Sequence, residues 1–393
     1  MNVDKPWLLP DGIDEFLPPQ AIRLEHMRRH LLKLFHSWGY ELVIPPMVEF
    51  LDSLVVGKAG DLESNTFKLT DSASGKLIGV RADITPQVSR IDAHRLKSEG
   101  TSRLCYFGHV LLTRPRELGG SRNPVQCGAE LYGYEGIAAD LEIINMMMEA
   151  LRAAKRDNCY IDLGHVGIFR SLTRQADLSA VTEAHLFDAL QRKAQPEIDE
   201  ILKSVANQSA TKMLASLTRL NGGVEVLDEA ADVLSHADEA VKKALGDLQE
   251  IAQGFKKRWP DKYLNIDLAE LRGYAYHTGI VFGAYAPGYG QAIAVGGRYD
   301  GIGEVFGRHR PATGFSLDLT AIMGLDENIA DKRSGVFAPS SDDARLAKKV
   351  AELRAQGERV IQALPGEEDA SVVYCDRVLV NEDNNWMIKN LRK

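Results

Sequence analysis

The chain has 393 residues, of which 45% are hydrophobic and 26% are charged, and this composition is typical of a globular protein with two or three domains. Its net charge of −8 argues against a nucleic-acid-binding protein, because such proteins usually carry a basic face. No apolar run approaches the ~20 residues that cross a bilayer, and the first residues lack the apolar core of a signal peptide, so we expect a cytoplasmic protein.

The N-terminal part of the chain alternates between helical and strand-like patterns of apolar residues. A long antiparallel strand pair is expected in the middle of this part. The expected elements are a helix over 18–38, a strand over 40–50 broken at Pro45-Pro46, a hairpin over 66–85, a helix over 85–96 capped by Thr85, strands over 103–113 and 125–134, a helix over 139–157 and a strand over 159–166.

From about 167 to 257 the pattern is almost entirely helical, which predicts a helical insertion. Strands resume over 263–273, 276–286 and 291–301, and residues 311–325 predict a strand that leads into a helix. An antiparallel sheet interrupted by helices indicates an α+β fold rather than a doubly wound parallel sheet.

We therefore expect a core domain over 1–325 and a short α/β segment over 326–393. In the second segment the sequence predicts a strand at 334–340, a helix over 342–364 and a hairpin near 370–388.

The four cysteines form no C-x-x-C pair, so we expect reduced, buried thiols and no metal site. The stretch "AVGGRYDGI" over 294–302 matches neither phosphate-binding glycine pattern, and it predicts a tight bend at the end of a strand.

Polar residues within the sheet-forming segments are the candidates for a binding site. Gln126 and Glu130 lie four residues apart, so both project from one face of a strand, and Asp83 and Thr85, two residues apart, share a face by the same alternation. Arg272 follows the strand "NIDLAEL". Carboxylates suit an ammonium group and arginine suits a carboxylate, so the set fits a small zwitterion. A surface network of salt bridges is the alternative explanation.

Several segments, taken in order, resemble histidyl-tRNA synthetase. They are "GYELVIPPMVEF", "VRADITPQVSR", "SRNPVQCGAELYG", "GGRYDG", "PATGFSLDL" and above all "RGYAYHTGIVF", which is similar to the histidine-recognition motif of that synthetase and its paralogue. The resemblance covers about 1–325 and implies a class II synthetase-like antiparallel sheet flanked by helices. It also implies that the first helix and strand form a homodimer.

The resemblance further implies a histidine-binding site. Asp83, Thr85 and Gln126 would contact the α-ammonium group, Glu130 an imidazole nitrogen and Arg272 the carboxylate.

Two further positions of the same motif depart from the family pattern. Tyr276 and His277 align with two tyrosines, one of which contacts the imidazole, and Ala275 stands where an aspartate is expected. These departures imply a site that retains histidine binding with altered contacts.

The arginines that grip ATP phosphate in class II synthetases do not align with arginines here. Leu112 falls at the position of the first, with Arg114 out of register, and Thr320 and Ala321 replace the Glu-Arg pair that contains the second. Without these cations we expect no adenylation activity, no catalytic residue and no cofactor. The C-terminal segment is also too short for the family's anticodon-binding domain, so no tRNA binding is expected.

This combination resembles the regulatory subunit of ATP phosphoribosyltransferase. That family implies a homodimer that joins the short-form catalytic subunit in a hetero-octamer of four plus four, activates the first step of L-histidine biosynthesis and conveys feedback inhibition by histidine. Two alternatives stay open: a histidine-adenylating enzyme, and a scaffold whose pocket no longer binds a ligand.

Overall fold

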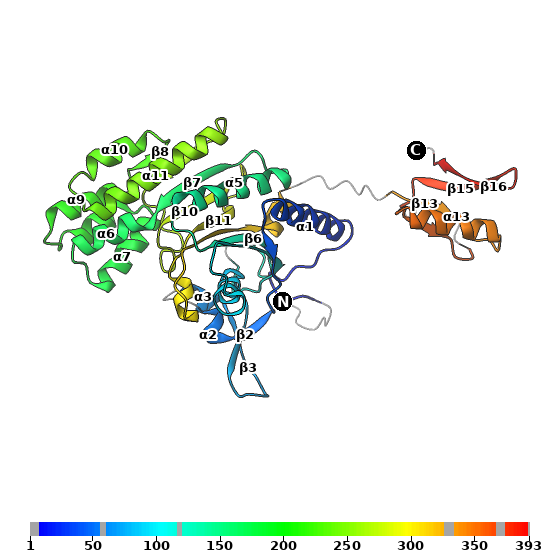
Figure 1. Cartoon of the computed structure of the whole chain (residues 1–393), viewed down its shortest axis with the longest axis horizontal. Helices are drawn as coiled ribbons and strands as arrows, with labels where there is room; N and C mark the ends of the chain where they lie inside the picture. Colours follow the sequence, from blue (N-terminus) through cyan, green and yellow to red (C-terminus); the bar gives the residue numbers. More distant parts are fainter. Residues whose placement is uncertain (1–7, 56–59, 116–119, 326–333, 367–373, 392–393) are drawn as a thin grey trace. The chain divides into compact units, whose positions relative to one another are not determined.

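The computed structural model describes residues 8–55, 60–115, 120–325, 334–366 and 374–391. The chain divides into two compact units, of which one contains Leu24–Asp326 and the other contains Glu327–Lys393 (Figure 1). Among the described helices, none combines the length and the apolar character that crossing a membrane requires.

A mixed, mostly antiparallel sheet forms the centre of the first unit. In the described part of the chain it has nine strands in the order β1-β5-β6-β12-β11-β10-β7-β9-β8, and β1–β5 and β7–β9 are its parallel pairs. The strands are β1 (Glu41–Leu42), β5 (Ser102–His109), β6 (Val125–Tyr132), β7 (Tyr160–His165), β8 (Asn221–Gly222), β9 (Leu264–Asp267), β10 (Ile280–Tyr285), β11 (Ala292–Arg298) and β12 (Ala312–Asp318). The α+β prediction is confirmed.

Helices cover both faces of this sheet. On one face lie α1 (Gln20–Ser37) and α5 (Ile137–Ala153), and Phe35 of α1 meets Phe315 of β12 edge to face at 5.9 Å. The opposite face carries α4 (Thr85–Arg90), its continuation η1 (Ile91–Leu96) and η2 (Ile302–Phe306), packed on a buried cluster of apolar residues. The candidate site lies on this second face.

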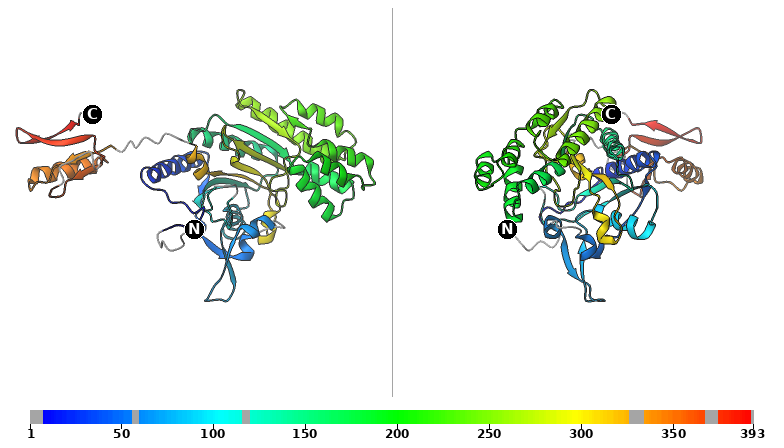
Figure 2. Two further views of the ribbon diagram at one scale, coloured as in Figure 1. Left: turned by 180° about the vertical axis from the view of Figure 1, so that it is seen from behind. Right: turned by 60° about the vertical axis from the view of Figure 1, so that its left-hand side comes forward.

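A smaller three-stranded sheet follows the first large-sheet strand. It consists of β2 (Val48–Phe50), β3 (Phe67–Thr70) and β4 (Leu77–Val80), with α2 (Leu51–Leu54) and α3 (Gly60–Asn65) beside it. The break at Pro45-Pro46 is confirmed, since the chain leaves the large sheet before it and enters the small sheet after it. The β3–β4 hairpin projects from the first unit (Figures 1 and 2).

The helical insertion lies between β7 and β9, and the short strand β8 within it pairs with β9 at the edge of the sheet. Figure 1 shows it in green as one block of helices beside β7 and β10. It comprises α6 (Val166–Gln175), α7 (Ala180–Gln191), α8 (Gln195–Leu202), α9 (Gln208–Ser216), α10 (Val226–Val233) and α11 (Glu239–Arg258). The side chains of Ser179, Asn207 and Asp238 cap α7, α9 and α11, which explains where these helices begin.

The second unit has its own sheet and its own buried cluster. Helix α13 (Ala344–Ala355) packs on a sheet of order β14-β13-β15-β16 through Leu346, Val350 and Leu353. The strands are β13 (Val336–Ala338), β14 (Val360–Gln362), β15 (Arg377–Glu382) and β16 (Asn385–Asn390). Asp383 and Asn384, both at positive φ, form the two-residue turn of the last hairpin.

Two predictions about helix ends are wrong. The helix expected over 342–364 ends at Ala355, because Gly357 adopts a φ of +84° and the chain turns back to form β14. Thr85 does not cap α4: Ile84 occupies the cap position without a side-chain hydrogen bond, and the Thr85 hydroxyl donates instead to Glu130. The four cysteines are free and buried, as expected.

Candidate functional site

Gln126 and Glu130 project from the same face of β6, as their spacing predicts. Glu130 Oε1 accepts a hydrogen bond from Thr85 Oγ1 at 2.8 Å, and Glu130 Oε2 accepts one from the Tyr299 hydroxyl. Gln126 Oε1 accepts from the Ile84 amide at 3.2 Å, while its Nε2 is buried without a partner among the described residues. The two side chains therefore meet the segment that leads into α4.

Burial controls the protonation of Glu130, whose exposed fraction is 1%. Desolvation raises the pKa of Glu130 to about 8, although the hydrogen bonds from Tyr299 and Thr85 oppose the shift. The carboxyl group is therefore predominantly neutral at pH 7 and able to donate as well as accept a hydrogen bond.

Asp83 and Thr85 are brought together by a turn. The sequence placed both on a strand, but β4 ends at Val80, and Asp83 lies in the irregular segment before α4. Asp83 Oδ1 accepts from the Thr85 amide at 3.1 Å. The two side chains lie together for this reason and not because of strand periodicity.

A row of glycines in the sheet makes room for the candidate side chains. A Cβ at Gly314 of β12 would collide with the Glu130 carboxylate, and a Cβ at Gly297 of β11 would come within 2.8 Å of the His277 ring. The predicted bend at the end of a strand is confirmed, because β11 ends at Arg298 and the chain turns at Asp300 and Gly301.

Arg272 lies in the turn that follows β9, which ends at Asp267, rather than at the end of the strand as predicted. Its guanidinium donates to the Tyr285 hydroxyl and lies 3.7 Å from a Glu270 carboxylate oxygen. Burial alone would lower the pKa of Arg272, but the charges of Glu270 and Tyr285 raise it. A ligand carboxylate would therefore compete with these two partners.

His277 and Tyr276 are neighbours with different surroundings. His277 is buried, its Nδ1 lies 3.0 Å from the Arg272 carbonyl oxygen, and burial lowers the pKa of His277 to about 4, so the ring is neutral at pH 7. The Tyr276 side chain is partly exposed and lines a cavity.

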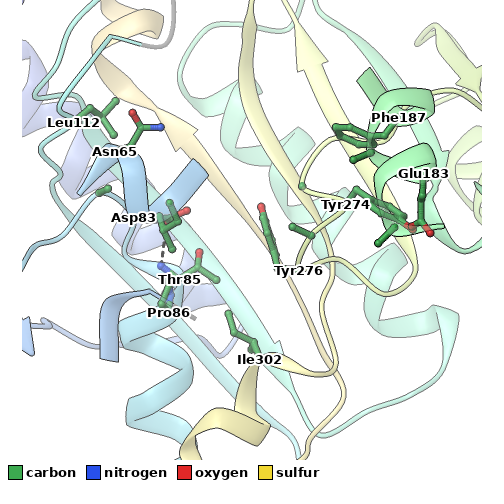
Figure 3. Close-up of a pocket in the computed structure, with 16 residues that line it drawn as sticks. Asn65, Asp83, Thr85, Pro86, Leu112, Glu183, Phe187, Tyr274, Tyr276 and Ile302 are labelled. Carbon is green, nitrogen blue, oxygen red and sulfur yellow. Dashed lines mark hydrogen bonds between the residues drawn. The ribbon is translucent and has the colours of Figure 1, made fainter. Parts of the chain in front are cut away.

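This cavity has a volume of about 610 Å³ and lies between the α4 side of the core and helix α7 (Figure 3). Of the predicted site residues, Asp83, Thr85 and Tyr276 line it. Gln126, Glu130, Arg272 and His277 are not among its lining residues. The lining residues are Leu62, Asn65, Ala82, Asp83, Thr85, Pro86, Leu112, Ala180, Glu183, Ala184, Phe187, Gly273, Tyr274, Ala275, Tyr276 and Ile302.

Sequence reasoning missed the partners that complete the site. Tyr299 follows β11 and contacts Glu130, Tyr285 ends β10 and contacts Arg272, and Glu183 and Phe187 come from the insertion. The aromatic residues at strand ends were a usable signal, whereas nothing in the helical pattern of α7 distinguishes Glu183 from a solvated surface residue.

Comparison with known proteins identifies the family. A family model described as histidyl-tRNA synthetase matches residues 12–322, and one described as the ATP phosphoribosyltransferase subunit HisZ C-terminal domain matches residues 333–389. A protein of Alkalilimnicola ehrlichii named ATP phosphoribosyltransferase regulatory subunit is 52% identical to this chain, and the match covers 99% of this chain and 98% of that protein. A protein of the same name from Thioalkalivibrio sulfidiphilus is 53% identical, and the match covers 98% of each chain. This chain belongs to the ATP phosphoribosyltransferase regulatory subunit family.

Solved structures support the same fold for this regulatory-subunit family member. A protein of Bacillus halodurans described as an ATP phosphoribosyltransferase regulatory subunit/histidyl-tRNA synthetase superposes with a TM-score of 0.83 at 24% identity, covering 96% of this chain and 99% of that one. A histidyl-tRNA synthetase from Nostoc gives 0.79 at 19% identity, with coverages of 98% and 94%. The class II synthetase-like fold is confirmed.

The two positions assigned to lost arginines have ordinary structural surroundings. Leu112 is buried in the cavity wall, and Arg114 lies two residues further on with an exposed side chain. Ala321 lies in the first turn of α12 (Leu319–Gly324), where its amide donates to the capping Asp318. The loss of the phosphate-gripping arginines stays a prediction.

Proposed function

We propose that this chain is a non-catalytic regulatory subunit that activates the short-form catalytic subunit of ATP phosphoribosyltransferase in the first step of L-histidine biosynthesis. The observation that carries the proposal is the identity of 52–53% to regulatory subunits over nearly the full length of both chains. The match at 333–389 to a domain described for this subunit supports it in the C-terminal segment.

L-Histidine is the proposed effector of this site. Asp83, Thr85 and Gln126 would contact its ammonium group, Glu130 and Tyr276 its imidazole, and Arg272 its carboxylate, with His277 packed beneath. The position of Asp83, Thr85 and Tyr276 on one cavity supports this assignment, as does the unpartnered Nε2 of Gln126. Histidine would inhibit by binding one state of the complex more tightly, and such couplings are typically about 1–3 kcal/mol.

The chain itself is proposed to catalyse no reaction. Adenylate formation builds negative charge on phosphate, and one lost donor to such charge typically costs about 10²–10³ in rate. The apolar Leu112 in the cavity wall supports the absence of this chemistry.

The proposed assembly is a cytoplasmic hetero-octamer of four regulatory and four catalytic chains, with a homodimer formed through the synthetase-like core. No tRNA and no cofactor take part in it. Co-expression with a short-form catalytic subunit, followed by mass measurement, tests the stoichiometry. A complex of any other composition would contradict it.

Turnover of a short-form catalytic subunit, measured with and without this chain, tests the proposed function. We expect turnover to rise on addition of the chain and to become sensitive to histidine. Arg272→Ala and Glu130→Ala should reduce histidine sensitivity while leaving activation, and Glu250→Ala on the exposed face of α11 is the matched control. Unchanged turnover and histidine response in the presence of the wild-type chain would refute the proposal.

Two further measurements separate the alternatives. Histidine-dependent exchange between ATP and pyrophosphate would show an adenylating enzyme. Calorimetry with L-histidine separates a working pocket from a scaffold, since a scaffold would give no heat of binding with the wild-type chain.

A further inference from the structure

The cavity extends beyond the residues proposed to bind histidine. Its far wall comes from the helical insertion, where Ala180, Glu183, Ala184 and Phe187 of α7 line it, and from the loop that carries Tyr274. Figure 3 shows Glu183, Phe187 and Tyr274 on one side of the space and Asp83 and Leu112 on the other, with Tyr276 between them. The volume of about 610 Å³ lies in the range of about 300–1,000 Å³ that accommodates drug-sized ligands.

The insertion side of the cavity is aromatic and held in place by its own contacts. The Tyr274 ring lies 5.5 Å from the Phe187 ring and 5.3 Å from the Phe169 ring, and the Tyr274 hydroxyl donates to Glu183. These contacts fix Tyr274 before any ligand arrives. A preformed aromatic surface of this kind favours a flat or apolar group.

The charges of the cavity disfavour phosphate. Its lining includes the carboxylates of Asp83 and Glu183 and, among these described lining residues, no lysine, arginine or histidine. Helix α7 begins at the cavity, but Glu183 lies in its first turn and offsets the positive end of the helix dipole. Arg170, which stacks on the Tyr274 ring at 4.8 Å and donates to the Tyr274 carbonyl, does not line the cavity.

From this geometry we infer that the α7 end of the cavity is a second subsite, which takes an aromatic, phosphate-free group attached to a ligand whose ammonium lies at Asp83. The inference rests on the proposed amino-acid site for the position of the ammonium group. It adds that the site accepts ligands larger than a free amino acid, and that the insertion supplies the selectivity for the added group.

Two ligands that differ only in the added group test the inference. L-Histidinamide and L-histidine β-naphthylamide both lack the carboxylate, so the ratio of their dissociation constants isolates the naphthyl ring. Calorimetry with the full-length chain should give at least about tenfold tighter binding of the naphthylamide, because the ring buries apolar area against Phe187 and Tyr274. ATP at millimolar concentration should give no binding.

Variants of α7 then locate the subsite. Phe187→Ala should reduce the affinity ratio to less than about threefold and leave the dissociation constant of histidinamide within twofold. Ala184→Trp, which fills the subsite, should have the same effect and serves if Phe187→Ala fails to fold by circular dichroism. Val181→Ala, at an exposed position of the same helix, is the matched control and should keep the full ratio.

Three outcomes would overturn the inference: equal affinities of the two amides for the wild-type chain, no binding of either, or a ratio that survives both Phe187→Ala and Ala184→Trp. Activation of the catalytic subunit is measured separately. If the chain activates the catalytic subunit but binds the two amides equally, only the subsite is refuted. If the chain binds the naphthylamide more tightly but does not activate the catalytic subunit, only the proposed function is refuted.

Discussion

The charged side chains Glu130 and Arg272 contact protein groups before any ligand binds. Glu130 accepts from Thr85 and Tyr299, and Arg272 contacts Glu270 and Tyr285. A ligand must exchange these contacts for its own, so the net gain for each new hydrogen bond is modest.

Glu130 should make the stability of the protein depend on pH. Its pKa is about 8 in the folded protein against an ordinary 4.5, so folding takes up a proton between these values. Protonated Glu130 therefore contributes its full stabilisation below pH 4.5. The free energy of unfolding falls by up to about 1.4 kcal/mol per pH unit as pH rises from 4.5 towards 8. Glu130→Gln should flatten this slope, measured by urea denaturation from pH 5 to 9.

Glu142 provides the matched control for this measurement. Although burial raises the pKa of Glu142, hydrogen bonds from Arg103 and Tyr40 lower it below the ordinary value. The contribution of Glu142 to the free energy of unfolding therefore changes only at acidic pH. Glu142→Gln should therefore keep the wild-type slope between pH 5 and 9. An unchanged slope in Glu130→Gln would contradict the assignment of the raised pKa.

Strands β11 and β12 contribute to the site mainly through glycines, whose missing side chains leave room for the neighbouring residues. Gly314 pairs with Glu130 across β12 and β6 and with Gly297 across β12 and β11, so the sheet surface is flat where Glu130 and His277 lie. A larger residue would displace these side chains or the strand. The glycines thus shape the site although they carry no side chain.

Gly314→Ala should destabilise the protein by about 3 kcal/mol, because its Cβ would overlap the Glu130 carboxylate and the Ala129 carbonyl oxygen in a close-packed core. Gly246→Ala in the exposed interior of α11 meets no neighbouring atom and should stabilise by about 0.5–1 kcal/mol. Urea denaturation measures both, and equal effects of the two substitutions would refute this interpretation.

The two compact units separate the site from the C-terminal sheet. All residues that line the cavity lie between Leu62 and Ile302, and the second unit encloses its own apolar cluster around Leu346 and Val350. The insertion, by contrast, belongs to the same unit as the site and supplies one cavity wall.

A chain truncated after residue 326 should keep its fold and its ligand site. We expect its melting temperature to change by less than about 2 °C, or about 1 kcal/mol for a unit of this size, and histidine affinity to stay within twofold. Calorimetry measures both quantities. The control is Leu346→Ala in the full-length chain, which disrupts the buried cluster of the second unit and should also leave histidine binding intact. Loss of binding in both variants would show that the site depends on the C-terminal unit.

Elements with strong periodicity were predictable from the sequence. The helices around Leu31 and Ile144 and the pair β5–β6 follow from apolar spacings of about 3.6 and 2 residues, which are local properties of the chain. Prediction failed where tertiary contacts override local preference. Val360 and Ile361 continue a helical pattern but belong to strand β14. The Thr85 hydroxyl donates to the buried Glu130 carboxyl group instead of capping α4.

Sequence alone established the α+β class, the insertion, the family resemblance and the shared face of Gln126 and Glu130, because these depend on composition, periodicity and motif order. The tertiary structure alone decided which groups satisfy Glu130 and Arg272, that glycines clear the sheet beneath them, and that α7 closes the cavity. Those features arise between residues far apart in the chain, such as Glu130 and Tyr299 at a separation of 169 residues, and no local pattern encodes such a pairing.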